Sequence, residues 1–414
     1  MNLEVIANEI EESLQGKFKQ IEKTADFNQR KVIKAMQKNR LSDTHFAGTT
    51  GYGYDDIGRE VLDKIYADVF KAESALVRHQ IVSGTHALTV CLFGCLRPGD
   101  RMVAVTGAPY DTLAEVIGTR GEGQGSLKDF GVSYAQVDLK DNKPDYQLIA
   151  KALETDTKLV LLQRSKGYEW RDALTIEEIG KLCEFIKNIS PGTIILVDNC
   201  YGEFVEEREP LEVGADIIAG SLIKNPGGGL ALSGGYVAGK KEYVELVSYR
   251  TTAPGIGAEV GATLGNTRLI LQGFFIAPHI VSESLKGVVF CAKMMESLGY
   301  ETSPKSDGVR GDINQAIKFG NKDALIDFCQ GIQAASPVDS YVSPVPWDMP
   351  GYSHPVIMAA GAFVQGSSIE LSADAPIREP YIAYMQGGLT FAHIKYSVIM
   401  ALDRMIENGN LKNG

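Results

Sequence analysis

The segment at residues 216–239, DIIAGSLIKNPGGGLALSGGYVAG, carries the clearest structural signal in the chain. Its apolar start predicts a short buried strand that ends near Gly220, and Ser221 and Lys224 follow the strand. An amine in an apolar, glycine-rich setting is expected to have a lowered pKa, which suits a lysine that acts as nucleophile and base. The glycines at 227–229 leave room for a planar ring close to the backbone. A solvated loop lysine is the alternative interpretation of Lys224.

Short apolar strands alternate with helical stretches around this segment. The predicted strands are MVAVTG (102–107), VSYAQVDL (132–139), KLVLLQ (158–163), TIILVDN (193–199), DIIAGSL (216–222) and GGYVAG (234–239). This alternation predicts an α/β fold, with a mostly parallel sheet covered by helices on both faces. Ligands of such sheets bind beyond the C-terminal ends of the strands, so the residues that follow each strand are the first candidates for a site.

The two ends of the chain differ in character from the middle. The first ~45 residues show the spacing of an amphipathic helix, and a loop rich in glycine and tyrosine follows. Near the C-terminus, proline-rich loops mix with strands and helices. We therefore expect an N-terminal helix and loop at residues 1–60, a large domain at 61–290 and a smaller α+β domain at 291–414.

The stretch IVSGTHALTVCLFGCL (81–96) places Ser83, Gly84 and Thr85 between a strand-like end and an apolar helix. The start of a helix offers unpaired N–H groups and a favourable dipole, so a turn of small residues there can bind a phosphate. An ordinary Ser/Thr helix cap is the alternative interpretation.

Two more polar residues follow predicted strands. Asp198, in TIILVDNCYGEF, needs a partner if it is buried, and the protonated ring nitrogen of a pyridine cofactor is one such partner. Capping of the next segment or metal binding are the alternatives. Tyr110, in VTGAPYDTL, either stacks on a ligand ring or serves as a packing residue. The order of phosphate loop, strand-end aspartate and, about 26 residues later, Lys224 is more specific than any one of these features.

With SGT, Tyr110, VDNCYGE and SLIK in this order, the chain resembles the Cys/Met-metabolism branch of the fold type I enzymes that use pyridoxal 5'-phosphate (PLP). The stretches QRSKGYEWR (163–171), SLIKNPGGGLALSGGYVAG (221–239) and TTAPGIGAEVG (251–261) resemble in particular the methionine gamma-lyase-like, or aluminium-resistance, carbon–sulfur lyases. The resemblance extends from about residue 45 to the end. It implies a seven-stranded, mostly parallel sheet between helices, a smaller C-terminal α+β domain, and PLP as the cofactor.

The resemblance also implies roles for single residues. Lys224 would bind PLP covalently, Asp198 would pair with the ring nitrogen, and Tyr110 would stack on the ring. The phosphate would be contacted by Ser83, Gly84, Thr85 and Ser221.

Two positions depart from the pattern of the relatives. The segment GYGYDDIGRE (51–60) resembles the Tyr-x-Arg region that gamma-lyase relatives donate to the phosphate of a neighbouring subunit, but Tyr54 and Arg59 are five residues apart. In the usual S-x-T-K motif, Ile223 replaces the threonine and removes one hydroxyl from the phosphate site. The resemblance still implies a homodimer or homotetramer with shared active sites.

The reaction implied by the resemblance is β- or γ-elimination on a sulfur-containing amino acid such as cystathionine, cysteine or methionine, with Lys224 moving the proton. Arg378, in SSIELSADAPIREPY, is the candidate for binding the substrate carboxylate, and a surface arginine is the alternative. A PLP aminotransferase would share every cofactor residue. A non-catalytic PLP-fold binding protein is the third interpretation.

Composition excludes several other classes of function. The net charge of −11 over 414 residues disfavours nucleic acid and anionic membranes as partners. The polar N-terminus is unlike a signal peptide, and no apolar run approaches the roughly 20 residues of a membrane span, so we expect a cytoplasmic protein. The six cysteines form no C-x-x-C pair and the six histidines no zinc motif; we expect buried thiols and no metal.

Overall fold

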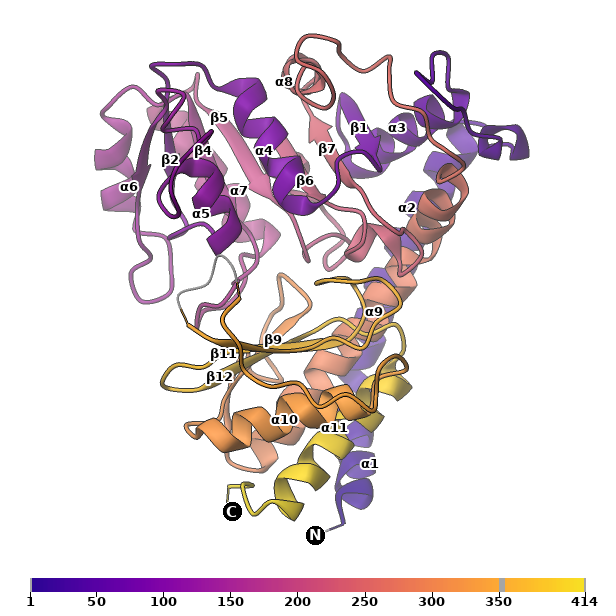
Figure 1. The fold of residues 1–414 in the computed structure, drawn as a ribbon, viewed down its shortest axis with the longest axis vertical. Coiled ribbons are helices and arrows are strands. Elements are labelled where there is room, and N and C mark those ends of the chain that lie inside the picture. The colour runs from indigo at the N-terminus through magenta and orange to yellow at the C-terminus, as the bar shows by residue number, and fades with distance from the viewer. Residues whose placement is uncertain (1, 350–353, 413–414) are drawn as a thin grey trace.

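The computed structural model of the protein describes residues 2–349 and 354–412. Two β-sheets organise the chain, a seven-stranded one and a five-stranded one (Figure 1). In the larger sheet the strand order is β1-β7-β6-β5-β4-β2-β3. Its strands are β1 (Ser74–Arg78), β2 (Arg101–Ala104), β3 (Ser133–Gln136), β4 (Leu159–Gln163), β5 (Ile194–Asp198), β6 (Ile217–Ser221) and β7 (Gly235–Gly239).

The central strands of the larger sheet are buried on both faces. Strands β3, β2, β4, β5 and β6 run parallel to one another, whereas β7 is antiparallel to both β6 and β1. Every residue of β4, β5, β6 and β7 is buried. Strands covered on both faces read as continuous apolar runs, and this explains why the sequence pattern was sufficient to predict them.

Helices cover both faces of this sheet. One face packs against α4 (Gly84–Cys95), α5 (Asp111–Ile117) and α8 (Lys241–Ser248). The other packs against α3 (Ile57–Phe70), α6 (Tyr146–Leu153), α7 (Ile176–Ile189) and part of α2 (Gln15–Lys38). The predicted α/β fold, with its mostly parallel sheet between helices, is confirmed.

The smaller sheet is antiparallel, in the order β10-β11-β12-β9-β8. Its strands are β8 (Glu301–Ser303), β9 (Asn314–Lys318), β10 (Val356–Ala359), β11 (Ser372–Pro376) and β12 (Ile382–Gln386). One face is covered by α10 (Lys322–Ala334) and α11 (Phe391–Glu407), and the other is turned toward the larger sheet (Figure 1). A separate antiparallel sheet in the C-terminal region agrees with the predicted α+β character.

One long helix connects the cores of the two sheets, and a short N-terminal helix packs in one of them. Helix α1 (Leu3–Ser13) packs in the C-terminal core, and α9 (Thr267–Ser297) contributes to both cores. Helix α9 has the length and apolar composition of a membrane span, but 72% of its most apolar window is buried inside the protein, as in a core helix. The domain boundary predicted after residue 290 falls inside α9. The remaining elements are the 3-10 helices η1 (Asp43–Phe46), η2 (Pro210–Val213) and η3 (Asn225–Gly227).

Candidate active site

A cavity of ≈ 570 Å³ lies where several parallel strands of the larger sheet end. Strands β4 and β5 end in register, with Gln163 paired to Asp198, and β6 ends beside them at Ser221. Because the strands are parallel, all three ends lie on the same edge of the sheet. Residues of the five-stranded sheet complete the cavity wall, and its volume suits a small-molecule ligand.

Most of the predicted site residues line this one cavity. They are Ser83, Gly84, Thr85, Tyr110, Asp198, Ser221, Lys224 and Arg378. These residues come from distant parts of the chain and from both sheets, so their convergence is a property of the fold rather than of any one motif.

Lys224 lies in a tight turn between β6 and η3. Its Nζ lies 4.0 Å from the centroid of the Tyr201 ring. Burial on its own opposes the charged amine, but the neighbouring Cys200, Tyr201 and Asp198 outweigh it and raise the pKa of Lys224. The predicted lowering of this pKa is therefore wrong for the protein without a ligand, because the acidic groups around the amine could not be read from the local sequence.

The three glycines after Lys224 pack against protein rather than against the cavity. A Cβ at Gly227 would overlap the Leu222 carbonyl, and Gly228, with φ +52°, lies against the backbone carbonyl of Gly273. These contacts let the chain double back beneath Lys224. The prediction that the glycines make room for a ligand ring is wrong, since they make room for the turn itself.

Asp198 is buried at the end of β5, with 5% of its surface exposed. Its Oδ1 accepts a hydrogen bond from the Cys200 N–H at 3.1 Å. One of the two carboxylate oxygens therefore caps the next segment, as the alternative interpretation predicted. Burial raises the pKa of Asp198, and the nearby Lys224 opposes that effect. The carboxylate still faces the cavity and is available to a ligand.

The start of α4 forms another wall of the cavity. Ser83 caps the helix through a hydrogen bond from the His86 N–H at 3.1 Å. The Tyr110 hydroxyl donates to Thr85 Oγ1 at 3.0 Å, which fixes the tyrosine beside the helix start. A Cβ at Gly84 would lie 3.1 Å from Cys200 Sγ, so a larger residue would fill this corner. The start of α4 therefore has both the Ser83 helix cap and the turn of small residues that could bind a phosphate.

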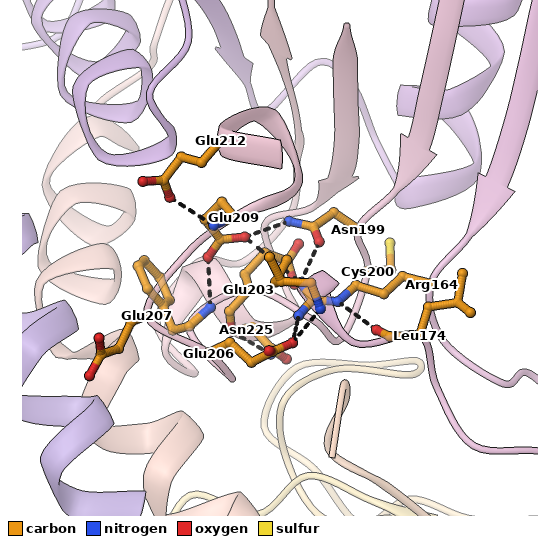
Figure 2. Close-up of polar contacts among 12 residues, drawn as sticks. Arg164, Leu174, Asn199, Cys200, Glu203, Glu206, Glu207, Glu209, Glu212 and Asn225 are labelled. Atoms are coloured by element: carbon orange, nitrogen blue, oxygen red, sulfur yellow. Dashed lines mark hydrogen bonds and ion pairs between the residues drawn. The ribbon is translucent and has the colours of Figure 1, made fainter. Parts of the chain in front are cut away.

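A buried polar network surrounds Arg164 and Asn199, which lie just after the ends of β4 and β5 (Figure 2). Arg164, which follows β4 directly, is fully buried and donates to Asn199 Oδ1 at 2.8 Å and to Glu206 at 3.1 Å. Asn199 in turn donates to Glu209 at 3.1 Å. These partners engage the Arg164 guanidinium inside the protein, and Arg164 does not line the cavity. Its side chain connects Asn199, the residue after Asp198, to Glu206 and Glu209.

Arg378 is the arginine that faces the cavity among the residues described by the structure. Its side chain is exposed at the rim, and one guanidinium nitrogen donates to the Tyr168 carbonyl at 3.2 Å. Arg171 is buried nearby but donates to the carbonyls of Gln163 and Ser165. Arg378 therefore retains free donors at the cavity mouth.

Comparison with known proteins identifies the family. The sequence profile of the family described as methionine gamma-lyase matches residues 3–406. The chain belongs to the methionine gamma-lyase family.

Solved structures of similar proteins agree with this family. The Clostridium novyi carbon-sulfur lyase involved in aluminum resistance is 54% identical, with 97% of this chain and 96% of that chain covered and a TM-score of 0.93. A Listeria monocytogenes protein described as a proposed cystathionine beta-lyase involved in aluminum resistance is 53% identical, with 97% and 99% covered and a TM-score of 0.95. Escherichia coli YhfS, described as pyridoxal-5'-phosphate dependent, shares the fold at 16% identity, with 94% and 97% covered and a TM-score of 0.63.

Two predicted residues of this methionine gamma-lyase family member lie away from the cavity of their own chain. The Tyr54 ring is 62% exposed and stacks on Tyr52. Arg59 is buried, and its guanidinium donates to the carbonyls of Gly53 and Gly261, which anchors the loop. Their predicted contact with a neighbouring subunit's phosphate concerns an assembly of two chains and stays a prediction.

Several cavity residues of the family member were missed by sequence reasoning. Lys166 is a second buried lysine, whose Nζ donates to the Ser303 carbonyl at 2.6 Å; burial lowers its pKa to about 8. Asn314, Asp374 and Gln386 line the cavity from the smaller sheet. The alternation of small and polar residues in the SADAP segment of β11 is the signal in the sequence for a strand with one polar face.

Proposed function

We propose that the protein is a PLP-dependent carbon–sulfur lyase that acts on a sulfur-containing amino acid. The observation that carries this proposal is the convergence of Lys224, Asp198 and the start of α4 on one cavity. An amine, a buried carboxylate and a phosphate-binding helix terminus match the three reactive parts of PLP, namely the aldehyde, the ring nitrogen and the phosphate. The neighbours named as carbon-sulfur and cystathionine lyases support the choice of reaction.

Each part of the cofactor would be held by a different element. Backbone N–H groups at the start of α4 and the buried Ser221 hydroxyl would bind the phosphate. The Asp198 carboxylate would keep the ring nitrogen protonated. The Tyr110 ring, fixed by its hydrogen bond to Thr85, would lie against the ring face. When bound, PLP withdraws electrons from the bond α to the substrate amino group, which allows a sulfur leaving group to depart.

The chain's own residues would move the protons. Lys224 Nζ, beside the Tyr201 ring, is placed to take the proton from the substrate α-carbon and to return one later. Burial, with Asp198 nearby, raises the pKa of Tyr110, so this hydroxyl stays protonated and keeps its bond to Thr85. Arg378 at the rim would orient the substrate through its carboxylate.

Product analysis tests the proposed reaction. Incubation with cystathionine or an S-alkyl cysteine is expected to release a thiol, ammonia and a keto acid. Exchange of the amino group with an added keto acid, without thiol release, would instead identify an aminotransferase. Binding of amino acids without any product would identify a non-catalytic protein.

Arg378→Lys is expected to raise KM for amino-acid substrates about 10- to 100-fold, because a lysine ammonium cannot reproduce the planar two-donor fork of arginine. Steady-state kinetics with two or more substrates measures the change. Arg250→Lys is the matched control, since Arg250 is exposed and lies outside the cavity. An unchanged KM in Arg378→Lys would remove Arg378 from the substrate site.

We further propose that the working unit contains at least two chains. The loop around Tyr54 carries exposed tyrosines, 74% for Tyr52 and 62% for Tyr54, and Arg59 fixes its base. In Figure 1 the indigo N-terminal part that carries the loop lies at the outer edge of the molecule, beyond α3. A two-fold interface, the commonest kind in homo-oligomers, would bring this loop to a partner's cavity.

Mixing two inactive variants tests the shared site. Lys224→Ala and Tyr54→Ala chains are each expected to be impaired alone, and their mixture is expected to regain part of the activity after subunit exchange. The gain arises because one site of each heterodimer would contain both intact residues. If exchange is demonstrated and activity does not return, each chain builds its site alone.

A further inference from the structure

The five-stranded sheet turns a polar face toward the cavity. Side chains alternate along its strands, so Ala373 and Ala375 of β11 point into the C-terminal core whereas Asp374 points the other way. The neighbouring strands follow the same pattern, and Asp374 pairs in register with Tyr384. The residues of this sheet that line the cavity include Asn314, Asp374, Tyr384 and Gln386.

Three of these side chains have polar atoms without a partner. Asp374 Oδ1, Gln386 Nε2 and Asn314 Oδ1 are buried and make no hydrogen bond within the described residues. The side chains are only 5%, 8% and 5% exposed, respectively. Gln386 pairs directly with Asn314 across β12 and β9, so these atoms lie on adjacent positions of one face. Unpaired buried polar groups are costly, and a cluster of them on a cavity wall indicates a place that a ligand completes.

Asp374 differs from the other acidic residues of the cavity. Asp111 forms an ion pair with Arg120, and Asp198 accepts a backbone N–H bond. Glu169 is exposed at the rim, where water solvates it. No ion pair to Asp374 occurs in the described parts of the chain, and burial raises its pKa to about 7. A buried carboxylate of this kind is satisfied best by a cation.

We propose that Asp374, with Gln386 beside it, selects substrates that carry a second amino group on the far side of the sulfur. This inference rests on the proposed lyase function, because it assigns the distal end of the same substrate. The α-carboxylate has Arg378 as its partner, and the α-amino group must reach Lys224. A distal ammonium would provide the positive charge that Asp374 lacks.

Tyr201 connects the two ends of this arrangement. The centroid of its ring lies 4.0 Å from Lys224 Nζ, and its side chain lies close to those of Asp374 and Gln386. A thioether chain that extends from the reacting carbon past Tyr201 would therefore come to the polar sheet face. A distal carboxylate alone would meet a second negative charge there and would bind poorly.

Two substrates of the same shape separate the effect of the distal charge from the effect of size. S-(2-aminoethyl)-L-cysteine ends in an ammonium, and S-propyl-L-cysteine replaces it with a methyl group. The holoenzyme is expected to favour the aminoethyl compound in kcat/KM on the order of 10- to 100-fold. Asp374→Asn, which keeps the shape and loses the charge, is expected to reduce the preference to within about 3-fold, through a lower kcat/KM for the aminoethyl compound.

Two controls make the comparison specific. Glu169→Gln removes an exposed carboxylate at the cavity rim and is expected to keep the wild-type preference. The melting temperature of Asp374→Asn at pH 8 is expected to equal or exceed that of the wild type, because asparagine removes a buried charge without a partner. If Asp374→Asn folds and keeps the preference, or if Glu169→Gln abolishes it, the proposal is overturned.

A binding measurement separates this proposal from the proposed reaction. L-lysine and L-2-aminoheptanoic acid share their length and lack a sulfur leaving group, so their binding can be followed by the absorbance change of the bound cofactor without turnover. Tighter binding of L-lysine that Asp374→Asn abolishes would support the distal-ammonium site even if no thioether were cleaved. Equal binding of the two amino acids to the wild type would overturn it, whatever the outcome of the product analysis.

Discussion

Replacement of Lys224 with alanine is expected to lower turnover at least ~1000-fold and to remove the covalently held cofactor. One amine performs two tasks in the proposed function, as the anchor of PLP and as the group that moves the substrate proton. Alanine can perform neither of these tasks. The variant is expected to fold, because the glycine contacts that shape the turn do not involve the Lys224 side chain.

A second lysine in the same cavity makes this prediction specific. Lys166 is fully buried, and burial lowers its pKa to about 8, whereas neighbouring acidic groups raise the pKa of Lys224. On pKa alone Lys166 would be the better nucleophile. The positions of the two amines favour Lys224 as the residue that binds PLP. Lys166 Nζ donates to the Ser303 carbonyl, whereas Lys224 lies beside Tyr201 near Asp198.

Borohydride reduction followed by peptide mapping distinguishes the two lysines. The visible absorption band is expected to disappear on reduction, and the modified peptide is expected to contain Lys224. Lys224→Ala should show no such band, while Lys166→Met should still yield the Lys224 adduct even if it melts at a lower temperature. A modified peptide that contains Lys166 would reverse the assignment.

Asp198→Asn is the second change expected to have a large effect, with turnover lowered on the order of 100-fold or more and the cofactor largely retained. Asparagine keeps the shape and can still accept the bond from the Cys200 N–H. It cannot hold the ring nitrogen of PLP in its charged form, so the electron-withdrawing capacity of the cofactor falls. The measurement is kcat per bound cofactor, with cofactor content determined separately.

Asp216 offers a matched control for Asp198. It is also a buried aspartate beside a strand end, but it precedes β6 and pairs with Lys187 and Lys240 at the opposite edge of the sheet. Asp216→Asn is expected to lower the melting temperature and to leave kcat per bound cofactor intact. If both variants lose turnover equally, the effect of Asp198 is structural rather than chemical.

The fold and the centre of the site could be predicted because buried parallel strands leave a strong local pattern. The apolar runs before Asp198 and before Ser221 identify β5 and β6, and the polar residues that end them lie at one sheet edge by the geometry of parallel strands. The position of β7 between β6 and β1 was not predictable in this way, since strand order depends on packing between distant segments.

Other properties of the site depend on neighbours that only the folded chain brings together. The pKa of Lys224 is raised by Cys200 and Tyr201, more than 20 residues away in the sequence. Arg164 also follows a strand of the larger sheet, and only its contacts with Asn199 and Glu206 show that its guanidinium does not face the cavity. Asp374 lies in a strand whose alternation is clear, but which face meets the cavity is decided by the packing of α10 and α11.

The position of α1 has a consequence for the order in which the protein is completed. Its apolar residues lie in the same core as those of α11, and Lys395 of α11 donates to Asn8 and Glu11 at 2.6 and 2.7 Å. The ribosome makes α1 long before α11, so the residues of α1 wait for the intervening segments before these partners exist. Contacts between such distant segments slow folding and leave apolar surface exposed in the meantime. The nascent α1 helix therefore needs protection during synthesis until α11 has been made.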